Sequence, residues 1–164
     1  MSVTRISVER FSIVSSKPFD QILKSLESVL GHPDMKVFMS TVTAANDLPE
    51  LEKIVHQAIG SSGLMEFVRF NIGQILQKQH GPRSPRILRV VMGNPLIMKE
   101  MAVHVHDAAS YAPVTVLIDE RPDGVHLSYD RMASLIASYG SVEASKVAET
   151  LDAKIEKLLE SVAQ

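Results

Sequence analysis

The sequence predicts an α+β fold in which a small, mainly antiparallel sheet of about five strands is covered by helices. Three observations predict it: short runs of alternating apolar residues, segments with apolar residues at helical spacing between them, and a long amphipathic segment at the C-terminal end. With 164 residues, the chain has the size of one ordinary domain and can bury a sizeable core without metals or disulfides. We therefore expect a single domain over residues 1–164.

The first two elements are expected to be a strand and a helix. Alternating apolar residues with one change of phase predict a strand over residues 3–14 that contains a bulge. Apolar residues then recur at helical spacing. They are Phe19, Ile22, Leu23, Leu26, Val29 and Leu30. Ser15 or Ser16 could cap this helix, and Gly31 and Pro33 end it.

Two further helices are expected before the middle of the chain. Residues 34–43 have the Val and Thr content of a strand, but Asp34 directly after a proline is a good helix start, and we favour the helix. Asp47 and Glu50 resemble a capping box that begins the next helix. Its apolar stripe is Leu51, Ile54, Val55, Ala58 and Ile59.

The middle of the chain predicts two strands with a short helical turn between them. Residues 64–72 form an apolar run of strand length, followed by a helical turn around Ile75 and Leu76. Residues 86–92 are too short and too β-branched for a helix and predict the next strand. At its end Asn94 can cap a helix and Pro95 suits the first helical position, so a helix should run from Pro95 to about His106.

A hairpin and a long helix complete the fold. Val114, Val116 and Ile118 alternate on one strand, and Val125, Leu127 and Tyr129 alternate on the next. Between them, Arg121-Pro122-Asp123-Gly124 has the composition of a tight turn. The buried stripe of the last helix is expected to be Val147, Leu151, Ile155, Leu158 and Val162.

The order and spacing of four short motifs resemble the family called domain of unknown function 302. The motifs are Gly93-Asn94-Pro95, Ala112-Pro113 leading into residues 114–119, Gly124, and Tyr129-Asp130. The resemblance covers residues 86–140, and residues 19–30 and 64–73 more loosely. It implies an α+β fold similar to the TATA-binding-protein-like group, often dimeric, and it implies no activity because the family has no established one.

The chain departs from that family at three places, one of which is the step from Tyr129-Asp130 to Arg131, where a proline often seen nearby is missing. Many members resemble Asp-His after the second strand, where this chain has Asn71-Ile72, so an acid/base or metal role for that pair does not carry over. Residues 32–60 look longer than the corresponding part of smaller members.

Composition and missing motifs exclude several classes of function. A net charge of -2 provides no basic field for phosphates, so we expect no nucleic-acid partner. Without cysteine there are no disulfides or thiolate sites, which a reducing compartment permits, and residues 1–9 lack the apolar core of a signal peptide. We expect a cytoplasmic protein with no membrane partner. His104 and His106 lack a third ligand, and no nucleotide-binding or hydrolase motif is present, so we expect no metal and no cofactor.

Six residues are candidates for a functional site. Arg69 and Arg89 interrupt apolar strands and could line one anion pocket if those strands are neighbours, although a pair with Glu66 or Asp119 or simple exposure explains each as well. Asn94 stands at a helix N-terminus that could receive an anion. The remaining candidates are Asn71 and Tyr129 as ligand-binding residues and His126 as an acid/base group.

We therefore expect a small-molecule-binding domain, with an anionic ligand as one option, that forms a homodimer. Its pocket should lie between the sheet and the helices near Gly93-Asn94-Pro95. One alternative is a cofactor-free isomerase or lyase acting on a small organic acid, with His126 as acid/base and an arginine stabilising negative charge. Another is a structural or dimerisation module that docks through the apolar stripe of the C-terminal helix.

Overall fold

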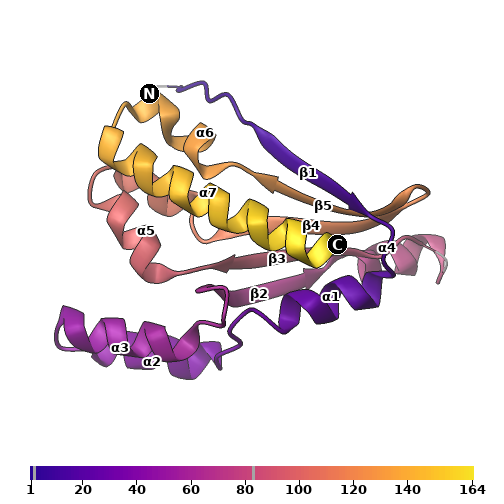
Figure 1. The fold of residues 1–164 in the computed structure, drawn as a ribbon, viewed down its shortest axis with the longest axis horizontal. Helices are drawn as coiled ribbons and strands as arrows, with labels where there is room; N and C mark the ends of the chain where they lie inside the picture. The colour runs from indigo at the N-terminus through magenta and orange to yellow at the C-terminus, as the bar shows by residue number, and fades with distance from the viewer. Residues whose placement is uncertain (2, 83) are drawn as a thin grey trace.

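Five strands form one antiparallel sheet in the computed structural model, which describes residues 1, 3–82 and 84–164 (Figure 1). The strand order across the sheet is β1-β5-β4-β3-β2. The strands are β1 (Arg10–Ser15), β2 (Met65–Asn71), β3 (Ile87–Gly93), β4 (Val114–Arg121) and β5 (Gly124–Asp130). The helices are α1 (Phe19–Glu27), α2 (Met35–Ala44), α3 (Leu48–Ala58), α4 (Ile72–His80), α5 (Pro95–Ala102), α6 (Met132–Ile136) and α7 (Val142–Ala163), with short 3-10 helices η1 (His106–Ser110) and η2 (Ala137–Tyr139). The expected α+β class with a long C-terminal helix is confirmed.

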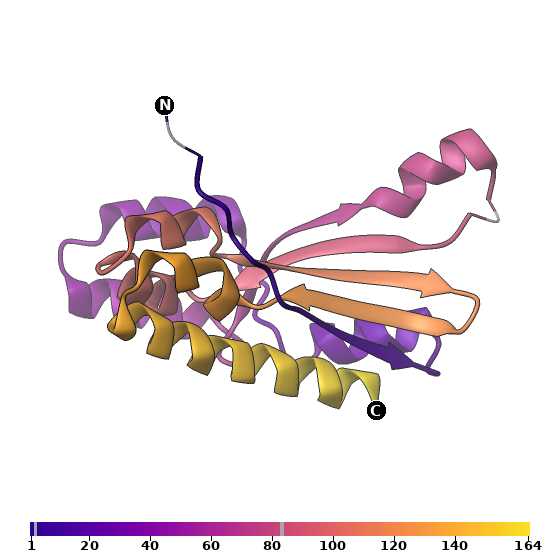
Figure 2. The same cartoon turned by 90° about the horizontal axis from the view of Figure 1, so that it is seen from above.

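One face of the sheet carries the main hydrophobic core. Residues directly opposite each other in the antiparallel register share a face, as Ile118 and Leu127 do, and both are fully buried. The long helix α7 lies across this face, with α1 beside its C-terminal part (Figures 1 and 2). Because α7 supplies an apolar stripe along its whole length, it holds the sheet and the shorter helices together.

The opposite face of the sheet is largely open. Ser12 and Val14 of β1, Val68 and Phe70 of β2, and Arg89 of β3 all point to this side and are exposed. Figure 2 shows α1 and α7 together on the other side of the sheet. Alternation along the strands therefore produces one dry and one wet face, as antiparallel sheets commonly have.

The first strand is shorter than expected, and its predicted bulge is wrong. β1 begins at Arg10 and pairs with β5 without a register shift. Arg10 lies opposite Asp130, where β5 ends, so residues 3–9 have no strand to pair with. The bulge in the sheet lies instead in β2, between Glu66 and Val68.

Helix α1 begins and ends differently from the expectation. Its N-cap is Pro18, without a side-chain hydrogen bond, because the hydroxyl of Ser15 donates instead to the Ala163 carbonyl oxygen at the end of α7. The helix ends at Glu27, before Gly31. A serine that looks like a local cap is thus used for a long-range contact.

The other helix starts follow the sequence closely. The segment favoured as helical forms α2, which begins at Met35, and its N-cap Asp34 accepts through its carboxylate from Val37 N at 3.0 Å. Asp47 and Asn94 also cap their helices through their side chains. Helix α5, however, ends at Ala102 rather than near His106, because the chain turns there to bring Val105 into the core.

The α2–α3 hairpin is an excursion of the chain between Gly31 and Gly60. The N–H groups of both glycines donate to the Leu64 carbonyl oxygen, at 3.0 and 2.9 Å, so the two ends of the excursion cross beside the start of β2. Phe38, Val55 and Met65 form a small core of their own beneath the hairpin. Within the part of the chain that the structure describes, no helix is long and apolar enough to cross a membrane.

Candidate functional site

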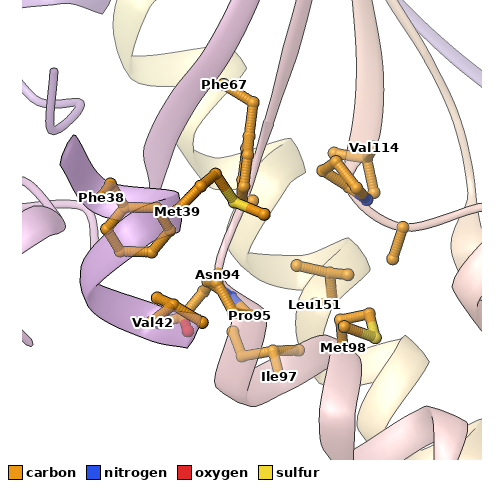
Figure 3. Close-up of a pocket in the computed structure, with 13 residues that line it drawn as sticks. Phe38, Met39, Val42, Phe67, Asn94, Pro95, Ile97, Met98, Val114 and Leu151 are labelled. Carbon is orange, nitrogen blue, oxygen red and sulfur yellow. The ribbon is translucent and has the colours of Figure 1, made fainter. Parts of the chain in front are cut away.

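An apolar cavity of about 230 Å³ lies where β3 ends and α5 begins (Figure 3). Six elements contribute to its wall: α2, β2, the end of β3, α5, the start of β4 and α7. The residues that line it are Phe38, Met39, Val42, Phe67, Gly93, Asn94, Pro95, Ile97, Met98, Ala112, Pro113, Val114 and Leu151. The cavity therefore lies at the Gly93-Asn94-Pro95 turn between sheet and helices, which is where the sequence analysis expected a pocket.

The turn itself has a structural explanation. Asn94 is extended, its Oδ1 accepts from Leu96 N at 2.9 Å, and its Nδ2 donates to the Gly63 carbonyl oxygen at 3.0 Å. Gly93 lies close to Pro113. A side chain at position 93 would place its Cβ 3.3 Å from the Pro113 Cβ, which is a tight contact. Because both ends of the Asn94 amide are occupied, Asn94 shapes the cavity rather than offering a free polar group to a ligand.

Arg69 and Arg89 do not meet in one pocket, and that expectation is wrong. Strands β2 and β3 are neighbours, but Arg69 lies opposite Val90 and Arg89 lies opposite Phe70. Since consecutive residues alternate between faces, this register places the two guanidinium groups on opposite sides of the sheet. Neither of them lines the apolar cavity.

Arg69 is held by two carboxylates on the helix-covered side. Its guanidinium donates to Glu66 at 3.0 and 2.7 Å and to Glu27 at 2.6 Å. These hydrogen bonds, that to Glu66 above all, raise the pKa of Arg69. An ion pair with Glu66 was the predicted alternative to a ligand-binding role for Arg69, and this ion pair is present.

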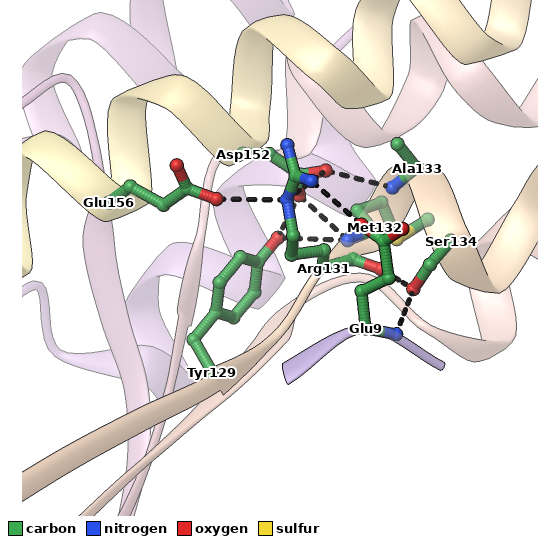
Figure 4. A network of polar contacts seen from close by, with 8 residues as sticks. All are labelled: Glu9, Tyr129, Arg131, Met132, Ala133, Ser134, Asp152 and Glu156. Atoms are coloured by element: carbon green, nitrogen blue, oxygen red, sulfur yellow. Dashed lines mark hydrogen bonds and ion pairs between the residues drawn. The ribbon is translucent and has the colours of Figure 1, made fainter. Parts of the chain in front are cut away.

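Asn71 and Tyr129 are both engaged in hydrogen bonds within the chain, Asn71 with a nearby backbone group and Tyr129 with a residue of α7. Asn71 is the last residue of β2, at the end remote from the cavity, and it caps α4 by accepting from Gln74 N at 3.1 Å. The Tyr129 hydroxyl donates to Asp152 of α7 at 2.5 Å (Figure 4). Burial, together with that hydrogen bond, raises the pKa of Tyr129 above its ordinary value.

Asp152 is a buried carboxylate that holds several elements together, and it was not among the residues predicted to matter. It is fully buried, and its carboxylate accepts from Met132 N at 2.7 Å and Ala133 N at 3.0 Å as well as from Tyr129 (Figure 4). It thereby caps α6 from another helix. A signal was present in the sequence, because Asp152 stands four residues after Ala148 on the apolar stripe of α7.

Arg131 extends this polar network to the surface. Its Nη1 lies 2.7 Å from the Glu9 carboxylate, and its Nε lies 2.9 Å from that of Glu156 (Figure 4). Glu9 belongs to the segment before β1, and its N–H donates to the Ser134 hydroxyl at 3.0 Å. The network fastens the N-terminal segment, α6 and α7 to one another.

The histidines are not placed for catalysis in the apolar cavity. His126 Nε2 lies 2.8 Å from Asp123 Oδ1, and this hydrogen bond lowers the pKa of Asp123. His126 points to the open face, opposite Val14 and Asp119, and does not line the cavity. His104 and His106 border a shallow hollow, and among the described residues no group of three or more His, Cys, Asp or Glu side chains could hold a metal ion.

Comparisons with known proteins agree on one family. The family model described as "Domain of unknown function DUF302" matches residues 40–162 of this chain. A similar solved structure is the crystal structure of an uncharacterized conserved protein DUF302 from Bacillus stearothermophilus, with a TM-score of 0.66 and 9% sequence identity over 94% of this chain and 98% of that chain. At that identity the likeness shows a shared fold. None of the curated proteins compared with this chain matches it.

Proposed function

This chain belongs to the DUF302 family, whose name assigns no activity, and from the geometry of its apolar cavity we propose that it binds a small, neutral, apolar molecule there. The observation that carries the proposal is a cavity of about 230 Å³ whose lining side chains include no charged group. A cavity of this kind is the usual place for a small-molecule site in a compact domain.

The size of the cavity limits the ligand. An apolar cavity of about 150 Å³ accepts a molecule as large as benzene, so about 230 Å³ suits a ligand with about nine non-hydrogen atoms. A substituted benzene or the end of a branched hydrocarbon chain has this size. A larger ligand would extend through the mouth of the cavity.

The polarity of the lining disfavours the anionic ligand that the sequence analysis kept as an option. The one polar side chain among the lining residues is Asn94, whose amide is already hydrogen-bonded at both ends. A carboxylate buried there would lose its hydration without gaining a donor. A neutral apolar molecule has little hydration free energy to lose when it enters the cavity.

Two methionines adapt the cavity to its ligand. Met39 of α2 and Met98 of α5 extend into the space between the helices (Figure 3). Because an unbranched thioether side chain has several accessible rotamers, these residues can adjust to ligands of different shape. Helix α2 contributes Phe38, Met39 and Val42 to the cavity wall and is exposed to solvent on its other side. We therefore expect the ligand to enter past α2.

The two alternative functions receive less support. No titratable side chain lines the cavity, and His126 lies on the other face of the sheet, so an isomerase or lyase would lack its acid/base group there.

The apolar stripe of α7 is buried against this chain's own sheet and helices, as Leu151 and Ile155 show. A homodimer, which the family resemblance implies, would therefore have to use another surface.

Filling the cavity is expected to abolish binding. We take toluene as the probe and Val42→Phe as the blocking variant, because Val42 lines the cavity from a half-buried position on α2. In the unmodified protein, toluene should shift the ¹³C-methyl NMR signals of Met39 and Met98 through its ring current and leave buried Met132 unchanged. Toluene at ten times its Kd should also add about 1.4 kcal/mol to the free energy of unfolding.

The matched control is Val37→Phe on the same helix. Val37 is 60% exposed and does not line the cavity, so this variant adds the same side chain and should keep both the methyl shifts and the stabilisation. The proposal is wrong if saturating toluene leaves Met39 and Met98 unshifted, or if Val42→Phe and Val37→Phe respond alike.

A further inference from the structure

We propose that the open face of the sheet carries a second site, which binds a small organic monocarboxylate through the guanidinium group of Arg89. This site borders the proposed apolar cavity at Val114 but opens on another side, because Arg89 points to the face that the α1 and α7 helices leave uncovered. The two sites would take ligands of opposite character, one neutral and one charged.

The site is a hollow of about 430 Å³ that extends across the middle strands. Its volume lies within the usual range of ligand pockets, about 300–1,000 Å³. Leu117 of β4 and Leu135 of α6 supply apolar surface. Several lining residues carry hydroxyl groups, among them Ser110, Tyr111, Thr115 and Ser128. The mixture suits a ligand with an apolar body and one polar end.

Arg89 is the cation of this hollow and lacks a counter-ion within the described chain. Four arginines lie on strands, and three of them pair with carboxylates: Arg10 with Asp130 at 2.6 Å, Arg69 with Glu66 at 2.7 Å and Arg121 with Asp119 at 2.6 Å. Within the described residues, the guanidinium group of Arg89 makes one hydrogen bond, to the Thr115 hydroxyl at 3.5 Å. Its donors therefore remain available to an incoming anion.

Neighbouring side chains orient this guanidinium group. Its central carbon lies 5.8 Å from the centroid of the Phe70 ring on β2, and Leu117 lies directly opposite Arg89 on β4. An aromatic face on one side and a hydroxyl on the other leave the planar fork of donors facing the hollow. A carboxylate can accept two parallel hydrogen bonds from such a fork.

Charge in the hollow favours a ligand with one negative charge. At the far side, Arg10 donates to both oxygens of Asp130, at 2.6 and 2.9 Å, so this pair is neutral as a unit. The excess charge of the hollow is then that of Arg89. One guanidinium group and an apolar floor suit a monocarboxylate better than inorganic phosphate, which needs donors around all its oxygens.

Benzoate is a suitable probe, because it joins one carboxylate to a flat apolar ring. In two-dimensional amide NMR of the full chain, benzoate should shift the signals of Arg89, Thr115 and Leu117. Arg89→Gln should weaken benzoate binding about tenfold or more, since the charge-assisted bonds are lost. Arg89→Lys keeps the charge without the fork and should bind with intermediate affinity.

The control is Arg121→Gln, which removes a strand arginine that lies outside the hollow and should leave benzoate affinity unchanged. Arg89 is exposed, so its variants should keep the fold, which circular dichroism checks. Equal affinity of Arg89→Gln and the unmodified protein would overturn the proposal, as would phosphate displacing benzoate at equal concentration. Loss of benzoate binding in Val42→Phe would also overturn it, because benzoate would then occupy the apolar cavity; the toluene experiment fails or succeeds independently.

Discussion

Asp152→Ala is expected to lower the free energy of unfolding by about 3–5 kcal/mol, the largest effect of any single side chain considered. The Asp152 carboxylate is fully buried and accepts from Tyr129, Met132 and Ala133. Without it, the Ala133 N–H group and the buried Tyr129 phenol lose their acceptor, and the Met132 N–H group keeps only its bond to the Tyr129 hydroxyl at 3.2 Å. Urea unfolding followed by circular dichroism measures the loss.

Tyr129→Phe is the matched control for this prediction. It removes the bond that the phenol donates to Asp152 and the bond that it accepts from Met132 N, but both backbone donors stay bonded to Asp152, so it should cost about 1 kcal/mol. A cost for Asp152→Ala no larger than that of Tyr129→Phe would show that water reaches the start of α6 and replaces the carboxylate. Hydrogen exchange at Met132 and Ala133 would reveal such water directly.

Gly31→Ala is expected to destabilise the protein by about 3 kcal/mol. Gly31 does not have a positive φ, so its role is one of packing. A Cβ there would overlap the Ala58 carbonyl oxygen and come within 2.8 Å of Gly60 N, and both of these neighbours are backbone atoms. The crossing at the base of the α2–α3 hairpin would have to open, and the α2 wall of the apolar cavity would move with it.

Gly140→Ala provides the contrast. Gly140 has a φ of 70° and no atom within 4 Å of an added Cβ, so the variant should lose about 1 kcal/mol through backbone strain alone. Thermal unfolding of both variants, with toluene binding as a second readout, separates the two causes. If Gly31→Ala unfolds like the unmodified protein and still binds toluene, the crossing is not tightly packed.

Most elements of the fold could be predicted from the sequence because their signals are local. Asp34, Asp47 and Asn94 cap helices through backbone groups two or three residues away, and a single sequence displays such pairs directly. The position of the cavity was also predictable, since a strand that ends in Gly93-Asn94-Pro95 and continues as a helix must join the two layers there. The apolar character of the cavity was not, because its wall combines α2, α5 and α7.

The sequence by itself determined the five strands and most of the helices, where most of those helices begin, and which residues of the β4–β5 hairpin are buried, but not helix α6. Only the tertiary structure decided that Arg69 and Arg89 lie on opposite faces of the sheet. It also decided that the Ser15 hydroxyl donates to the Ala163 carbonyl oxygen, and that Asp152 caps helix α6, whose first residue lies twenty positions before it. The physical reason is distance along the chain. Periodicity and capping act over a few residues, whereas strand register and the pairing of buried polar groups depend on partners that only the folded chain brings together.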